Sequence, residues 1–111
     1  MAVYSNISID QGSDFTAEIV VNDSTGSVAN LTGYTGAGQI RKTYTSSTFT
    51  AFGVTIAGAS QGVLTITLSN TVTNGMKAGR YVYDVEITKT STGEKTRVVE
   101  GQLTVNPGVT Q

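Results

Sequence analysis

Apolar residues recur at every second position through much of this sequence, and short polar segments separate the stretches that carry them. A period of two places alternate side chains on opposite faces of a β-strand, whereas a helix needs a period near 3.6. The clearest stretches are residues 15–21, 52–56, 64–68, 81–87 and 99–105. Short strands at regular spacing with turn residues between them indicate a β-sandwich or a β-barrel. The predicted fold class is therefore all-β.

Chain length and composition agree with one domain of this class. The 111 residues suffice for a single hydrophobic core, so residues 1–111 are predicted to form one domain. Val, Ile and Thr are abundant, and such β-branched side chains suit a pleated surface. The sequence contains no cysteine, which excludes disulfides, thiolate metal sites and cysteine nucleophiles. It also contains no histidine, the commonest general base.

The charge distribution favours neither nucleic acid nor a membrane as partner. Seven basic residues stand against eight acidic ones, whereas nucleic-acid binding needs a clustered basic surface. The longest uncharged stretch, residues 43–76, is rich in Thr, Ser, Gly and Asn and is too polar to span a bilayer. The first residues, MAVYSNISIDQG, lack the basic and apolar regions of a signal peptide, so we expect none.

The segment MKAGRYVYDVEI carries Gly79, Tyr81 and Tyr83 at a spacing of two residues. In an immunoglobulin domain a tyrosine two residues before the second cysteine hydrogen-bonds to backbone and fixes the crossover between the sheets. We assign this corner to Tyr81. Tyr83 stands where the cysteine would be, and we expect its ring to point into the core and fill the volume of the missing disulfide.

A helical turn is predicted near residues 70–75, immediately before this corner. Ser69 or Asn70 can cap its start, and Gly75 can end it. A further short strand is expected at residues 37–42, and Pro107 is expected to stop the last strand. The predicted fold is thus an immunoglobulin-like antiparallel β-sandwich of about seven strands with one short helical turn.

Asp10 and Asp14 flank the first predicted turn with oxygens that calcium accepts. Calcium needs several more oxygen ligands, and no third carboxylate is close in sequence. We therefore favour an ordinary turn stabilised by an aspartate side chain, and no metal-binding residue is predicted.

Arg80, Asp84 and Glu86 lie on one face of a predicted strand, and Arg97 starts the strand expected to pair with it. Paired carboxylates can act as acid and base in glycoside cleavage. On an exposed sheet face with basic neighbours, cross-strand ion pairs are the favoured interpretation. We predict no catalytic or cofactor-binding residue, and we expect the protein not to be an enzyme.

Arg41, Lys42, Tyr44 and Phe49 lie in QIRKTYTSSTFTAF, a segment rich in Thr and Ser that is predicted to form a loop. Basic and aromatic side chains in a loop can stack on sugars or bases, but two basic residues are too few for a strong phosphate-binding surface. An interface with the same domain or a neighbouring subunit is favoured. The alternative is a carbohydrate- or cell-surface-binding module with Tyr44, Phe49 and Phe52 as its stacking platform.

Four segments of the chain together resemble small virion structural proteins of tailed bacteriophages, especially marine and cyanobacterial ones. These segments are SIDQGSDFTAEIVV, ANLTGYTGAGQIRKTYTSS, MKAGRYVYDVEI and TRVVEGQLTVNP. The pattern, over residues 4–107, is also similar to the immunoglobulin-like N-terminal domain of phage baseplate and receptor-binding proteins. The resemblance implies a non-enzymatic sandwich that docks on a capsid, neck, tail or baseplate. It transfers no catalytic or ligand-binding residue.

The same resemblance implies that the protein is made in the host bacterial cytoplasm and resides in the virion. The pattern ends close to Gln111, so we expect no receptor-binding segment after it, and either a stand-alone accessory protein or an isolated domain. A cytoplasmic origin fits the missing disulfide, because thiols are kept reduced there.

The expected partners are other virion proteins and further copies of the same chain. An open sandwich leaves edge strands with unpaired backbone groups. This chain has few charges and a single proline, Pro107, to protect them. We therefore expect a homo-oligomer or a multi-copy position in the virion. No nucleic acid, membrane or cofactor is expected, and a glycan is the less favoured ligand.

Overall fold

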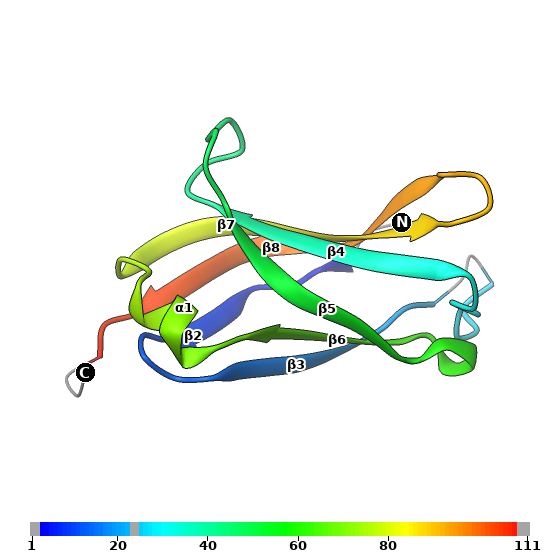
Figure 1. Ribbon diagram of the computed structural model, residues 1–111, viewed down its shortest axis with the longest axis horizontal. Coiled ribbons are helices and arrows are strands. Elements are labelled where there is room, and N and C mark those ends of the chain that lie inside the picture. The colour runs from blue at the N-terminus through cyan, green and yellow to red at the C-terminus, as the bar shows by residue number, and fades with distance from the viewer. Residues whose placement is uncertain (1–2, 23–24, 109–111) are drawn as a thin grey trace.

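The computed structural model describes residues 3–22 and 25–108, and strands dominate it (Figure 1). The strands are β1 (Val3–Tyr4), β2 (Ile7–Asp10), β3 (Phe15–Val20), β4 (Tyr34–Arg41), β5 (Thr50–Gly58), β6 (Val63–Leu68), β7 (Gly79–Lys89) and β8 (Lys95–Asn106). A 3-10 turn, η1 (Ala59–Gln61), and a helix, α1 (Asn70–Asn74), join β5 to β6 and β6 to β7. The predicted all-β class is confirmed.

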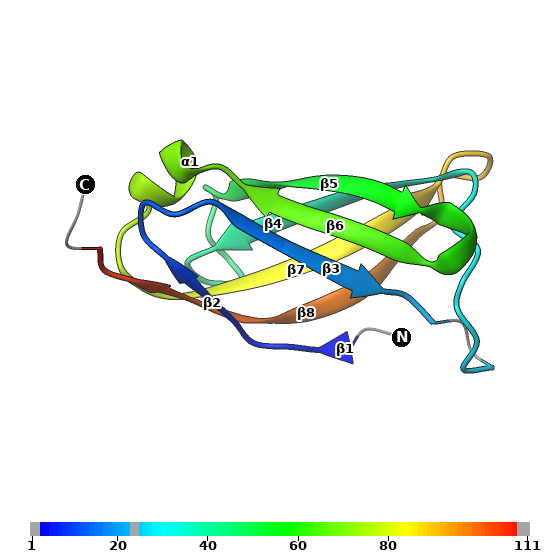
Figure 2. The same ribbon diagram turned by 90° about the horizontal axis from the view of Figure 1, so that it is seen from below.

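The strands form two facing layers that one long strand connects. Their order is β1-β8-β7-β4-β5-β6-β3, with β2 also paired to β8. Residues 50–52 of β5 pair with β4, whereas residues 53–58 pair with β6. β5 therefore leaves the layer of β4, β7 and β8 and enters the layer of β6 and β3, as Figures 1 and 2 show from two sides. This arrangement confirms the predicted immunoglobulin-like sandwich.

The structure differs from a purely antiparallel arrangement at the N-terminal edge. β1 and β2 both run parallel to β8, with Val3 opposite Val99 and Ile7 opposite Leu103. The reason lies in the connection that follows. β2 ends beside Asn106, the last residue of β8, and the chain turns there into β3 of the other layer. A strand that must reach this end of the sandwich has to run in the direction of β8.

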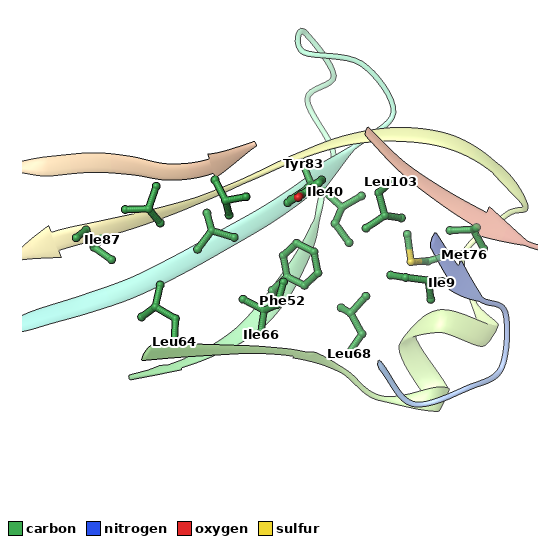
Figure 3. Packing of buried hydrophobic residues seen from close by; sticks show 14 of the residues in the cluster. Ile9, Ile40, Phe52, Leu64, Ile66, Leu68, Met76, Tyr83, Ile87 and Leu103 are labelled. Carbon is green, nitrogen blue, oxygen red and sulfur yellow. The ribbon is translucent and has the colours of Figure 1, made fainter. Parts of the chain in front are cut away.

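The core lies between the two layers, and Figure 3 shows its side chains from close by. The most deeply buried hydrophobic residues are Leu31, Ile40, Leu64, Ile66, Val85, Leu103 and Val105. In β6 the buried residues alternate with less buried ones along the strand, from Leu64 to Leu68. The period of two that predicts the strands therefore also selects the side chains that fill the core.

Three aromatic rings cross the core from β3 to β7. The ring of Phe52 lies 6.3 Å from that of Phe15 and 6.0 Å, edge on, from that of Tyr83. These two strands occupy the places of the strands that a disulfide links in an immunoglobulin domain. Edge-to-face aromatic pairs add stabilisation beyond the area that they bury. Ring packing thus connects the layers where this cysteine-free chain has no covalent link.

β4 begins at Tyr34, earlier than the strand predicted at residues 37–42. The segment TGYTGAG resembles a turn because of its glycines. Gly33 does lie in a turn, with a φ of +84°, whereas Gly36 and Gly38 lie within β4, where neighbouring side chains approach closely. A Cβ atom on Gly38 would lie 2.9 Å from the Phe52 ring. The aromatic ring of β5 therefore needs a glycine at this position, and the glycine is compatible with an extended strand.

β8 interrupts the alternation with a bulge at Val98. Val85 pairs with Val99 and Glu86 with Arg97, so Val98 is the additional residue. Val98 and Val99 are both buried. A bulge of this kind re-aims the side chains on one side of it, and the prediction from the period alone placed only Val99 in the core.

The predicted helical turn is confirmed as α1. The Ser69 hydroxyl accepts a hydrogen bond from the Val72 N–H at 3.4 Å, and Gly75 follows the last turn. A second helical element, η1, joins β5 to β6 and ends at Gly62, whose φ is +69°. Within residues 3–22 and 25–108, no helix has the length and apolarity needed to span a membrane.

Candidate docking surface

The loop between β4 and β5 projects from the body of the sandwich (Figure 1). It carries two large exposed aromatic residues, Tyr44 with 74% and Phe49 with 50% of their surface accessible. Exposed aromatic residues with a polar surround are characteristic of protein interfaces. We use the name docking loop for residues 42–49.

Arg41, at the end of β4, organises the distal part of the docking loop. Its guanidinium lies over the Phe49 ring, 5.1 Å from the ring centre. The same group donates hydrogen bonds to the Ser46 carbonyl oxygen and, at 2.9 Å, to Gln39 Oε1. The Thr43 N–H donates to the Ser46 hydroxyl at 3.0 Å. These contacts hold the loop in one conformation.

Lys42 belongs to the corner rather than to the loop tip. Its ammonium lies over the Tyr81 ring, 4.8 Å from the ring centre. The Tyr81 hydroxyl donates a hydrogen bond of 2.7 Å to the Lys77 carbonyl oxygen, which is the geometry of a tyrosine corner. Gly79 starts β7 with a φ of +141°, a conformation that residues with a side chain rarely adopt. The structure thus brings together Gly79, Tyr81 and Lys42.

Tyr83 points into the core, with 4% of its surface accessible. Its hydroxyl donates a hydrogen bond to the Ser5 carbonyl oxygen at 2.5 Å. Burial raises the pKa of the Tyr83 phenol above its ordinary value of 10.0; the hydrogen bond to Ser5 opposes this shift, and the charge of Tyr4 adds to it. Tyr83 is therefore a structural residue that is kept neutral.

A hollow of about 430 Å³ opens on the outer side of β4, β7 and β8, beside the docking loop. It is lined by Gln39, Arg41, Tyr44, Val82, Tyr83, Asp84, Glu86, Arg97 and Glu100. Tyr44 therefore forms part of the loop and part of the hollow. The exposed aromatic side chain and the charged floor make one continuous surface.

On the floor of this hollow, Arg97 pairs with two carboxylates. Arg97 contacts Asp84 at 3.3 Å and Glu100 at 3.5 Å. Asp84 and Glu100 lie directly opposite each other on β7 and β8, so a single guanidinium relieves their repulsion. Glu86 lies opposite Arg97, while Arg80 is exposed and opposite Thr104. The contact between Arg97 and Asp84 is thus a cross-strand ion pair, whereas that between Arg97 and Glu100 lies within β8.

Phe52 does not belong to an exposed aromatic platform. It is buried, with 6% of its surface accessible, and its ring packs between Phe15 and Tyr83. The alternative hypothesis, in which Tyr44, Phe49 and Phe52 together stack on a sugar, is therefore wrong for Phe52. The period of two already places Phe52 on the same side as Val54 and Ile56, which is the core side of β5.

Asp14 and Asp10 accept hydrogen bonds at and near the first turn. Asp14 Oδ1 accepts a hydrogen bond of 2.7 Å from the Asn70 N–H, at the start of α1. Asp10 Oδ1 accepts from the Asn106 side chain at 3.3 Å. Among the described residues, no group of three or more His, Cys, Asp or Glu side chains lies in an arrangement that could hold a metal ion.

Thr73 is the polar residue that sequence reasoning missed. It is completely buried in α1. Its hydroxyl accepts from the Gly12 N–H at 3.1 Å and donates to the Ser13 carbonyl oxygen at 2.8 Å. These two hydrogen bonds join the turn between β2 and β3 to the connection between β6 and β7. No local signal distinguishes Thr73 from the many other threonines of this chain.

The sandwich, the crossing strand β5 and the tyrosine corner define an immunoglobulin-like β-domain. No protein-family model matches the sequence, and no curated protein is significantly similar to it in sequence. The fold is similar to the N-terminal domain of phage TP901-1 ORF48, with a TM-score of 0.58 and 14% identity over 92% of this chain and 85% of that one.

Two further structures share the architecture less closely. InlP of Listeria monocytogenes has a TM-score of 0.49 and 14% identity over 95% of this chain and 28% of its own. A family 123 glycoside hydrolase from Clostridium perfringens has a TM-score of 0.46 and 12% identity over 97% and 24%.

Proposed function

We propose that this protein is a non-enzymatic structural component of a tailed phage particle and docks on other virion proteins. The observation that carries the proposal is the similarity in fold to a phage domain, which extends over most of both chains. The four sequence segments that resemble phage virion proteins support the same function. Its expected location is the virion, at a capsid, neck, tail or baseplate position.

The docking loop and the hollow beside it are the proposed contact surface. Tyrosine and arginine are enriched among the residues that dominate binding energy at interfaces. Tyr44 is exposed, whereas Arg41 is fixed by Phe49, Gln39 and Ser46. A partner would meet an aromatic side chain on an ordered loop next to a floor of charged side chains.

Purified virions of the source phage test this proposal directly. We expect mass spectrometry to detect the protein in particles, and chemical cross-linking to connect Lys42 or Lys77 to another virion protein. Absence of the protein from repeated particle preparations would contradict the proposal.

A pair of matched variants tests the surface. Tyr44→Ala should reduce incorporation into particles by about tenfold, which is typical of the loss of a dominant interface residue. Val28→Ala is the control, because Val28 is also an exposed hydrophobic residue (50% accessible) but lies outside the docking loop. Equal incorporation of both variants would exclude the docking loop as the contact.

A further inference from the structure

β3 ends the strand order and, in the part of the chain that the structure describes, pairs with β6 alone. Figure 1 shows β3 along the lower margin of the molecule, and Figure 2 shows the molecule from that side. The pairing with β6 continues without a bulge from Phe15 opposite Leu68 to Val20 opposite Val63. The other side of β3 is therefore a straight, open strand edge.

The backbone groups on this open edge can be assigned by alternation. The Val21 N–H, one residue beyond β3, donates to the Gly62 carbonyl oxygen at 2.8 Å, on the side of β6. Successive residues of an antiparallel strand direct their N–H and C=O groups to opposite neighbours. Thr16, Glu18 and Val20 consequently direct theirs to the open edge, and their side chains are exposed.

The opposite edge of the strand order is protected. β1 and β2 have two and four residues, and short edge strands discourage pairing. Between them the Asn6 side chain accepts from the Gln102 N–H at 3.1 Å, which interrupts the regular ladder. β3 has no such interruption, and Glu18 is its only charged residue. Of these two edges, β3 is the one suited to add a strand.

We propose that β3 is a self-association edge, on which β3 of a second copy pairs in antiparallel orientation with Ala17 opposite Ala17 of that copy. A two-fold dimer makes every contact twice. For the apolar face to continue across the dimer, odd-numbered residues must lie opposite odd-numbered ones, because strand side chains alternate. Phe15, Ala17 and Ile19 pack toward the core and meet this condition.

Charge selects this register over the symmetric one centred on Glu18. Centring the pair on Ala17 places Glu18 opposite Thr16 of the second copy and Phe15 opposite Ile19. Centring it on Glu18 would place two carboxylates directly opposite each other, which destabilises a sheet. The sequence FTAEIV is thus self-complementary when Ala17 lies on the two-fold axis.

This dimer is independent of the docking loop. The loop and β3 lie at opposite margins of the molecule in Figure 1. Pairing through β3 therefore leaves Tyr44 of both copies accessible and would present two docking loops to the virion. The docking loop is tested with Tyr44→Ala and the dimer with substitutions at Thr16. A negative result for one therefore does not contradict the other.

Two substitutions of one residue test the register by charge. Thr16→Glu places a carboxylate opposite Glu18 of the second copy at two symmetric positions and should weaken dimerisation by about tenfold. Thr16→Lys places an ammonium there instead and should strengthen it several-fold. Sedimentation equilibrium from tens to hundreds of micromolar measures both, and high salt should reduce the difference.

Cysteines test the same register geometrically, in a chain that contains none of its own. Mixing Thr16→Cys with Glu18→Cys should give a disulfide-linked dimer after mild oxidation, because directly opposed strand residues lie within reach of a disulfide. Each variant alone should remain largely uncrosslinked. Self-crosslinking of Glu18→Cys alone would overturn the register.

The proposal as a whole is overturned if the natural protein sediments as one chain throughout this concentration range. It is likewise overturned if Thr16→Glu and Thr16→Lys dimerise equally at low salt. At concentrations low enough to keep the chains monomeric, unfolding curves of both variants should match that of the natural protein, because Thr16 is exposed on β3. A variant that loses the dimer because it is misfolded is recognised by a different curve.

Discussion

The Tyr83 hydroxyl donates a hydrogen bond to the Ser5 carbonyl oxygen at 2.5 Å, across 78 positions of sequence. Ser5 lies at the break between β1 and β2, and its own N–H donates to the Glu100 carbonyl oxygen at 2.8 Å. A buried side chain of β7 therefore holds the N-terminal edge strands on the sandwich. The same ring contacts Phe52 and so takes part in the packing between the two layers.

Substitutions at Tyr83 should separate these two contributions. Tyr83→Phe keeps the ring and should lower the free energy of unfolding by about 1–2 kcal/mol, because the Ser5 oxygen loses its donor. Tyr83→Ala also opens a cavity and should cost about 3–5 kcal/mol. Urea unfolding measures both, with the exposed Tyr44→Ala as control at about 0.5 kcal/mol or less. Equal costs for all three would mean that β7 is not a core strand.

A methyl group at Gly101 should disturb the same junction. A Cβ atom there would clash with the Ser5 carbonyl oxygen and lie 2.8 Å from its carbon. Gly101→Ala should therefore destabilise the protein by about 1–3 kcal/mol and increase hydrogen exchange in β1 and β2. Gly58→Ala is the control, because its Cβ would meet Val63 at 3.5 Å, an ordinary contact. A Gly101→Ala variant as stable as the Gly58→Ala variant would contradict the packing.

Alkaline pH should destabilise the protein through Tyr83. Its pKa is raised in the folded protein, chiefly by burial, from the ordinary value of 10.0 that applies to the unfolded chain. Above that value the unfolded chain binds fewer protons than the native one, so stability falls as pH rises through the folded pKa. Below it the contribution is fully present. Urea unfolding at neutral and alkaline pH should show that the free energy of unfolding falls less for Tyr83→Phe than for the natural protein.

A substitution of Thr73 that conserves its shape should still lower the free energy of unfolding. Thr73→Val leaves the Gly12 N–H and the Ser13 carbonyl oxygen without their side-chain partner and should cost about 2–3 kcal/mol. Thr73→Ser retains the hydroxyl and should cost only about 1 kcal/mol for the lost methyl group. Thermal or urea unfolding distinguishes the two. A cost for the valine variant no larger than for the serine variant would show that these hydrogen bonds contribute little.

The tyrosine corner should contribute modestly to the free energy of unfolding. The hydrogen bond from Tyr81 to Lys77 lies in an exposed environment, so Tyr81→Phe should cost about 1 kcal/mol. The Lys42 ammonium keeps its aromatic contact in this variant. Unfolding by urea provides the measurement, and a cost near that of Tyr83→Ala would imply a larger role for the hydroxyl than one exposed hydrogen bond.

Sequence alone determined the features that depend on neighbours along the chain. The period of two identified β3, β5, β6, β7 and β8 and the inward sides of β6 and β7, because alternation is a property of any extended strand. It did not identify β1 and β2, which are short. Ser69 and Gly75 bounded α1, and the spacing of Gly79, Tyr81 and Tyr83 predicted the corner, because caps and corners involve residues only a few positions apart. The four residues of the loop segment were also found from their proximity in sequence.

Only the tertiary structure decided which of these residues act together. Arg41 stacks on Phe49, while its neighbour Lys42 turns to Tyr81. The parallel pairing of β1 and β2, the bulge at Val98 and the hydrogen bonds of Thr73 join segments far apart in the chain. Such contacts depend on how two sheets face each other, and a periodic pattern has no information about the distance between residues that meet across a core.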